Sequence, residues 1–236
     1  MKSYMRQEIK VEIPETCSSY GAQAMALKHL FASAAFGAAL NLFAGASWAE
    51  TFKIVGFGDS LMAGYQLAPG DAFTAKLETA LNAKGLDVTV ANAGVSGDTT
   101  AGGLSRLDWS VPDGTDLVIL ELGANDMLRG LPVAQTRDNL DQMLQRLSER
   151  DIPVVLAGMM AAPNLGPAYG ESYNAIFPEL AEDYDVPLIP FFLDGVTGVA
   201  GMVLEDGMHP NPQGVDVMVE RALPIVEQAV RDLREN

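Results

Sequence analysis

The sequence predicts an α/β fold with a doubly wound parallel sheet. From residue 52 onward, short apolar stretches rich in β-branched residues alternate with segments of helical periodicity. Most of the apolar stretches are continuous, and strands buried on both faces of a parallel sheet read this way. Regular alternation of strand and helix is typical of a sheet covered by helices on both faces.

Five strands are expected at residues 52–57, 88–91, 117–121, 153–157 and 186–190. Between them, apolar side chains recur at helical spacing. These helical groups are Phe73, Leu77 and Leu81, then Leu140, Leu144 and Leu147, then Tyr173, Phe177, Leu180 and Tyr184. In such sheets, functional sites form in the loops that follow the carboxyl ends of the strands.

The last helix is expected after Asn211, a good N-cap residue that is followed by Pro212 at the first helical position. Its apolar stripe consists of Val215, Met218, Ala222, Ile225 and Ala229.

Residues 25–49 have the three-part layout of a secretory signal peptide. Lys28 and His29 precede an apolar run, and Ser47-Trp48-Ala49 supplies small residues at a cleavage site. The run is about 17 residues long and rich in Ala and Gly, which is marginal for spanning a bilayer, so a retained membrane anchor is the alternative.

The protein is therefore expected to be exported, to the periplasm or outside the cell, without stable membrane insertion after cleavage. A signal normally begins at the N-terminus, so residues 1–24 are interpreted as an over-extended reading frame with Met25 as the start. Residues 50–236 are expected to form one domain, which is long enough for a full hydrophobic core.

Composition excludes several classes of function. The one cysteine, Cys17, precedes the expected cleavage site, so disulfides, thiolate catalysis and cysteine-based metal sites are not expected in the mature chain. The net charge of −16 becomes −17 when four basic and three acidic residues before position 50 are removed. Such a charge argues against nucleic acid and anionic membrane surfaces as partners.

A single histidine, His209, remains after the signal, because the only other histidine is His29. His209 lies in the turn Asp206-Gly207-Met208-His209-Pro210, and an aspartate three residues earlier can accept from its Nδ1–H. Nε2 would then be free to take a proton as a general base. Considered alone, a capping or merely exposed histidine is the alternative.

Ser60 is the candidate nucleophile that such a base would activate. It follows the first strand in Gly56-Phe57-Gly58-Asp59-Ser60-Leu61, where the turn into a helix would leave its hydroxyl exposed. An N-cap serine is the plain alternative. A nucleotide-binding loop does not fit the glycine spacing, and the nucleophile elbow of α/β-hydrolases requires glycine where Met62 stands.

Two further loops offer donors for the oxyanion of an acyl-transfer reaction. Gly97 follows the second strand and has no side chain to keep a substrate from its N–H. Asn125 follows the third strand and offers a neutral amide donor. Each loop taken singly is more often a turn or a cap. The joint pattern of Ser, Gly and Asn after successive strands, with Asp-x-x-His before the last helix, is specific.

These segments resemble the blocks of the SGNH (GDSL) hydrolase superfamily over essentially the whole mature chain. Ser60, Gly97, Asn125 and His209 match its four named residues, and Asp206 matches its triad acid. The segments Glu121-Leu122-Gly123-Ala124-Asn125-Asp126, Leu128-Arg129-Gly130, Tyr173-Asn174 with Ile176-Phe177, and Val186-Pro187-Leu188-Ile189-Pro190-Phe191-Phe192 resemble the subgroup of periplasmic thioesterase I, lysophospholipase L1 and arylesterase. Ala124 departs from that subgroup, which usually has a second glycine there.

The resemblance implies a three-layer α/β/α sandwich with a flavodoxin-like sheet, and hydrolysis of acyl esters and thioesters. Ser60, Asp206 and His209 would be catalytic, and Ser60, Gly97 and Asn125 would form the oxyanion hole, with no need for a cofactor. One histidine and no mature cysteine argue against a metal site, and weak calcium binding by clustered carboxylates is the alternative. A small acyl ester, thioester or lysophospholipid would be the substrate. A carbohydrate O-deacetylase and a non-catalytic envelope-binding protein stay open as alternatives.

Overall fold

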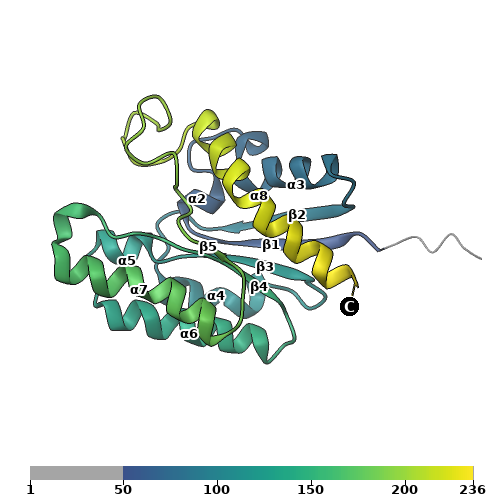
Figure 1. Ribbon diagram of the computed structural model, residues 1–236, viewed down its shortest axis with the longest axis horizontal. Helices are drawn as coiled ribbons and strands as arrows, with labels where there is room; N and C mark the ends of the chain where they lie inside the picture. Colours follow the sequence, from purple (N-terminus) through teal and green to yellow (C-terminus); the bar gives the residue numbers. More distant parts are fainter. Residues whose placement is uncertain (1–49, 236) are drawn as a thin grey trace, which may run out of the picture. The chain divides into compact units, whose positions relative to one another are not determined.

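Five parallel strands form one sheet in the order β2-β1-β3-β4-β5 in the computed structural model, which describes residues 50–235 (Figure 1). The strands are β1 (Phe52–Gly58), β2 (Val88–Gly94), β3 (Leu117–Glu121), β4 (Val154–Ala157) and β5 (Leu188–Ile189). All five expected strands are present, although β2 is longer than expected and β5 is shorter. The chain reverses its direction of travel across the sheet at β1, so the doubly wound prediction is confirmed.

The expected signal peptide, residues 25–49, and the residues 1–24 before it lie outside the described part of the chain. Within residues 50–235, no helix has the length and apolar character that crossing a membrane requires.

Helices cover both faces of the sheet. On one face, α3 (Phe73–Ala83) packs against α8 (Pro212–Glu235), and on the other α6 (Val133–Ser148) lies between α4 (Thr100–Ser110) and α7 (Pro167–Asp183) (Figure 1). Two short helices, α2 (Ser60–Ala63) and α5 (Ala124–Leu128), and two 3₁₀ turns, η1 (Pro69–Asp71) and η2 (Pro163–Leu165), lie in the connections. The three-layer α/β/α arrangement is thus confirmed.

The expected helical stripes face the core. Phe73, Leu77 and Leu81 of α3 are fully buried, as are Leu140 and Leu147 of α6. Asn211 caps α8 as expected, because its side-chain oxygen accepts from the N–H of Gly214 at 2.9 Å. Burial of these stripes against continuous apolar strands is the main source of stability for this fold.

Helix α4 has no counterpart among the helices expected from the sequence. Its sequence contains Gly102 and Gly103, which are poor helix formers, and its apolar stripe is weak. The structure explains Gly103, because a Cβ there would lie 2.3 Å from the side chain of Leu122. The helix forms where its backbone must approach the loop after β3 closely.

Glycines bring the first three strands together at their carboxyl ends. Gly58 of β1 pairs with Gly94 of β2 on one side and with Glu121 of β3 on the other. A Cβ at Gly94 would lie 2.3 Å from the backbone nitrogen of Ala63, so glycine is what allows α2 to lie directly on the end of β2. The segments that follow β1, β2 and β3 therefore begin side by side.

Candidate active site

Ser60 is the first residue of α2, immediately after the end of β1. Asp59 is the N-cap residue, and its Oδ1 accepts from the N–H of Leu61 at 3.0 Å. The helix ends after one turn at Gly64, whose φ of 75° is left-handed. Ser60 is 8% exposed as a whole residue, and it lines a pocket together with His209, whose Nε2 lies 2.8 Å from its hydroxyl oxygen.

His209 and Asp206 form a local pair in the loop before α8. The ring Nδ1 of His209 lies 2.7 Å from Oδ2 of Asp206, as the spacing predicts. Oδ1 of Asp206 accepts from the backbone N–H groups of His209 at 3.0 Å and Met208 at 2.9 Å. Those two backbone donors, together with the ring, lower the pKa of Asp206 to about 2, so the carboxylate is charged at neutral pH.

The imidazole joins this carboxylate to Ser60. Nε2 of His209 lies 2.8 Å from Oγ of Ser60, although the two residues are 149 positions apart. Because charged Asp206 only accepts hydrogen bonds, it fixes the proton of a neutral imidazole on Nδ1. Nε2 then accepts from the Ser60 hydroxyl. The ring of Tyr65 packs against His209 with a centroid distance of 4.4 Å and helps to hold its plane.

Asn125 lies in the first turn of the short helix α5, and not in a loop as expected. Its Nδ2 donates to Oδ2 of Asp59 at 2.9 Å. A primary amide has two N–H groups, so one is engaged by Asp59 and the other is available to a substrate. Asn125 and Ser60 line the same pocket.

Sequence reasoning missed the buried carboxyl pair of Asp59 and Glu121. Both side chains are fully buried, and the N–H of Asp59 donates to Oε2 of Glu121 at 3.1 Å. Burial, and next the charge of Asp59, raise the pKa of Glu121 well above its ordinary value. Burial also raises the pKa of Asp59, but hydrogen bonds from Leu61 and Asn125 favour its charged form. Both oxygens of Asp59 accept hydrogen bonds, as those of an ionised carboxylate do, whereas burial favours the protonated form of Glu121.

One feature of the sequence could have indicated this buried pair, namely a carboxyl group at the end of a continuous apolar strand. Glu121 closes the stretch Leu117–Glu121, all five residues of which are buried. Groups whose pKa is shifted by burial and by a charged neighbour cluster at functional sites.

Gly97 lies in the exposed turn after β2 and has a left-handed φ of 82°. Its carbonyl accepts from Nη2 of Arg129 at 2.6 Å. The residues that line the pocket beside Ser60 include Asn125 and His209 but not Gly97. The structure thus brings four of the five expected residues into direct hydrogen-bonded or pocket contact, and leaves Gly97 on the neighbouring loop.

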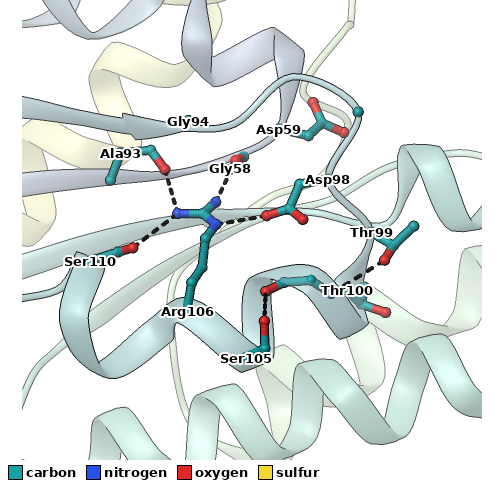
Figure 2. Close-up of polar contacts among 12 residues, drawn as sticks. Gly58, Asp59, Ala93, Gly94, Asp98, Thr99, Thr100, Ser105, Arg106 and Ser110 are labelled. Atoms are coloured by element: carbon teal, nitrogen blue, oxygen red, sulfur yellow. Dashed lines mark hydrogen bonds and ion pairs between the residues drawn. The ribbon is translucent and has the colours of Figure 1, made fainter.

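A buried arginine that the sequence did not point to ties this loop to the strand that carries Ser60. The guanidinium of Arg106, in α4, donates to Oδ2 of Asp98 at 2.7 Å and to the carbonyl of Gly58 at 2.8 Å (Figure 2). It also stacks over the ring of Phe57, 4.0 Å from the centroid. The remaining contacts of this guanidinium are the carbonyl of Ala93 and Oγ of Ser110.

Asp126 links α5 to α4 in a similar way. Its Oδ2 accepts from the N–H of Thr100 at 2.8 Å, and Asn139 of α6 donates to the Thr100 hydroxyl at 3.0 Å. All three side chains are buried. The segments that hold Ser60, Gly97 and Asn125 are therefore cross-linked by buried polar contacts, which restrict their relative movement.

An apolar pocket of about 470 Å³ opens beside the Ser60 hydroxyl. Its walls come from α5, from the segment after β4 and from the long loop before α8; they include Met127, Leu128, Met159, Met160, Phe191 and Leu193. A cavity of this size and lining suits an alkyl or aryl group, and it offers few hydrogen-bond partners to the hydroxyl groups of a sugar. Among residues 50–235, no group of three or more His, Cys, Asp or Glu side chains gathers as metal ligands would.

A parallel α/β sheet that places a hydrogen-bonded Ser–His–Asp set beside an apolar pocket is the architecture of a serine hydrolase acting on acyl groups. The chain belongs to the GDSL-like lipase/acylhydrolase family, whose sequence profile matches residues 57–217. This confirms the SGNH resemblance and makes the protein a carboxylic ester hydrolase.

Relatives agree with this assignment. The arylesterase of Vibrio mimicus is 41% identical over 162 residues, which cover 68% of this chain and 81% of the relative. The thioesterase 1/protease 1/lysophospholipase L1 of Escherichia coli K12 is 37% identical over 186 residues, which cover 77% and 87%. The crystal structure of AlinE4, an SGNH-hydrolase family esterase, is 47% identical with a TM-score of 0.65 and covers 76% of this chain and 97% of that one.

Proposed function

We propose that the chain hydrolyses acyl esters and thioesters through an acyl-enzyme on Ser60, with His209 as general base and Asp206 as its partner. The observation that carries this proposal is the pair of contacts at His209. Nε2 lies 2.8 Å from Ser60 Oγ, and Nδ1 lies 2.7 Å from Asp206 Oδ2. Both distances are within the range of hydrogen bonds that transfer protons in such sets.

In the first step, Ser60 Oγ forms a bond to the acyl carbon while its proton moves to Nε2 of His209. The imidazolium is stabilised by charged Asp206 and then gives this proton to the leaving oxygen or sulfur as that bond breaks. In the second step, His209 takes a proton from water, whose oxygen attacks the acyl carbon. Collapse of that intermediate releases the acid and returns the proton to Ser60.

The oxyanion of each tetrahedral intermediate needs fixed donors. We assign this role to the N–H of Ser60 in the first turn of α2, to the free N–H of the Asn125 amide, and to the N–H of Gly97. The link from Asn125 to Asp59 at 2.9 Å supports this assignment, because it holds the amide beside the nucleophile before substrate binds. Gly97 would contribute from the adjoining loop.

The apolar pocket supports substrates with an acyl or aryl group larger than acetyl. The printed names of the relatives, arylesterase and thioesterase 1/protease 1/lysophospholipase L1, point to aryl esters, acyl thioesters and lysophospholipids as the substrates to test. A carbohydrate O-deacetylase would need polar partners around the sugar, which this pocket offers sparsely.

A p-nitrophenyl ester series of increasing acyl length tests the proposal. We expect kcat/KM to increase beyond the acetate, and Ser60→Ala to lower kcat by a factor of roughly 10³ or more without a change in melting temperature. Activity confined to the acetate would favour a deacetylase, and no activity would favour a binding protein. Stoichiometric labelling of any serine other than Ser60 by an organophosphonate would refute the assigned nucleophile.

We also propose that the protein is exported after cleavage between Ala49 and Glu50. The layout of residues 25–49 supports this, and the net charge of −17 for the mature chain supports the absence of nucleic acid partners. Mass spectrometry of periplasmic or secreted material should find Glu50 as the first residue. Soluble, active protein with an intact Met1 or Met25 would contradict export.

A further inference from the structure

Exposed apolar side chains gather on one edge of the described domain. Seven large hydrophobic residues are exposed among residues 50–235, and six of them lie in connections that leave the carboxyl ends of the strands. We call these six the apolar edge: Tyr65, Val95, Leu128, Met160, Val199 and Met208. They are between 37% and 54% exposed. The seventh, Trp109, is near the end of α4, which runs back to the opposite edge of the sheet.

Two long segments on this edge contain no charged residue. Residues 158–170 follow β4 and residues 195–204 follow β5, in a chain whose charged residues amount to 19%. Both segments extend from the same side of the sheet (left in Figure 1), and both line the pocket beside Ser60. Exposed apolar side chains on two uncharged segments that line the same pocket are typical of an interaction surface.

We propose that the apolar edge docks on an uncharged lipid–water interface, and that a lipid ester enters the pocket from that interface without crossing water. This inference rests on the proposed function, since it supposes that the substrate is an acyl ester. Leu128, Met160 and Met208 belong both to the edge and to the pocket lining, so the docked surface continues directly into the site.

Charge selects the kind of lipid. Anionic leaflets attract basic segments and repel acidic proteins, and this chain has 31 acidic against 15 basic residues. A zwitterionic or neutral surface has no such repulsion. Insertion of a few apolar side chains from loops gives peripheral, reversible attachment rather than permanent anchoring.

A second copy or another protein is a poorer occupant of this edge. The pocket mouth lies within the edge, so a permanent protein partner would cover the route to Ser60. A lipid surface covers the same side chains and at the same time supplies the substrate.

Flotation with phosphatidylcholine vesicles measures docking without any hydrolysis. Val199 is exposed and does not line the pocket, so Val199→Asp should lower the vesicle-bound fraction by about tenfold, because a charge replaces a partitioning apolar side chain. Val199→Ser should give a smaller loss. Trp109→Asp, on the opposite edge, is the matched control and should bind as the wild type does. Vesicles containing phosphatidylglycerol should bind less protein at low salt.

Activity gives a second readout that separates this inference from the proposed function. Wild-type turnover of a monoacyl phosphocholine should rise above its critical micelle concentration, and Val199→Asp should abolish that rise. Both Asp variants should keep the wild-type kcat/KM for soluble p-nitrophenyl acetate and the wild-type melting temperature.

Equal binding by Val199→Asp and Trp109→Asp, tighter binding to anionic vesicles, or no binding to any vesicle would overturn the inference while leaving ester hydrolysis intact. A wild-type dimer that Val199→Asp dissociates would also overturn it and would assign the edge to a protein contact. Vesicle binding without hydrolysis of any ester would instead refute the proposed function.

Discussion

The side-chain amide of Asn125 is held by the carboxylate of Asp59, with Nδ2 donating to Oδ2 at 2.9 Å. A charged carboxylate accepts but does not donate, so it selects the amide orientation in which nitrogen faces Asp59. The second N–H of that nitrogen is then the one presented to the pocket. The residue directly before the proposed nucleophile thus orients a proposed oxyanion donor.

Replacing Asp59 with Asn should remove this selection, since an amide can pair with either orientation of Asn125. The N-cap hydrogen bond from the N–H of Leu61 should be kept, because Asn is also a good N-cap residue. We expect kcat for a p-nitrophenyl ester to fall by about 10-fold to 10²-fold with little change in KM. An unchanged kcat would show that Asp59 does not act through Asn125.

Asn125→Ala should lower kcat by about 10² to 10³ if the amide stabilises the oxyanion. The double variant with Asp59→Asn should then be little worse than Asn125→Ala alone, because both changes remove the same donor. Additive losses in the double variant would assign the two residues to separate roles. Melting curves of all three variants distinguish a loss of function from unfolding.

The buried Glu121 predicts a pH dependence of stability. Its pKa is raised in the folded state, so the unfolded chain ionises first as pH increases and the folded state loses relative stability. The loss begins near the ordinary glutamate value of about 4.3 and continues up to the raised folded pKa, with a slope of about 1.4 kcal/mol per pH unit. Glutamine does not titrate, so the stability of Glu121→Gln should not decrease over this pH range.

The difference in melting temperature between Glu121→Gln and wild type should therefore grow as pH increases through that window. Below it, the two proteins should behave alike. Parallel curves for the two proteins from acid to neutral pH would show that Glu121 is charged in the fold.

Arg106 should resist replacement by lysine. A guanidinium reaches Asp98 and the carbonyls of Gly58 and Ala93 at once, whereas an ammonium is a single point donor. We expect Arg106→Lys to lower stability by roughly 3 kcal/mol, as for a broken buried pair, and to lower kcat where protein remains folded. Arg231→Lys, on the exposed side of α8, is the control and should change neither quantity.

Charge should also separate substrates. At a net charge of −16, a polyanionic acyl-coenzyme A should be repelled, and its kcat/KM should increase with salt as repulsion is screened. A neutral aryl ester should show little salt dependence. A coenzyme A rate that falls with salt would reveal a local basic site for the polyanion.

The sequence by itself determined the elements and the local parts of the site. Continuous apolar stretches and helical stripes are properties of neighbouring residues, so the strands and the helices α3, α6, α7 and α8 could be read directly. The pair of Asp206 and His209 is equally local, because an i,i+3 turn brings the two side chains together. Helix α4 could not be predicted, because Gly103 in its centre is explained only by a close approach to the distant residue Leu122.

Only the tertiary structure decided which distant groups meet and what charge they carry. The contact between Ser60 and His209 spans 149 residues and depends on how α8 returns along the sheet. The raised pKa of Glu121 depends on burial beside Asp59, which comes from another strand end. The guanidinium of Arg106 likewise finds its partners, Asp98 and the carbonyl of Gly58, only when β1 and the loop after β2 lie next to α4. Desolvation and packing are properties of the assembled fold, and no short stretch of sequence contains them.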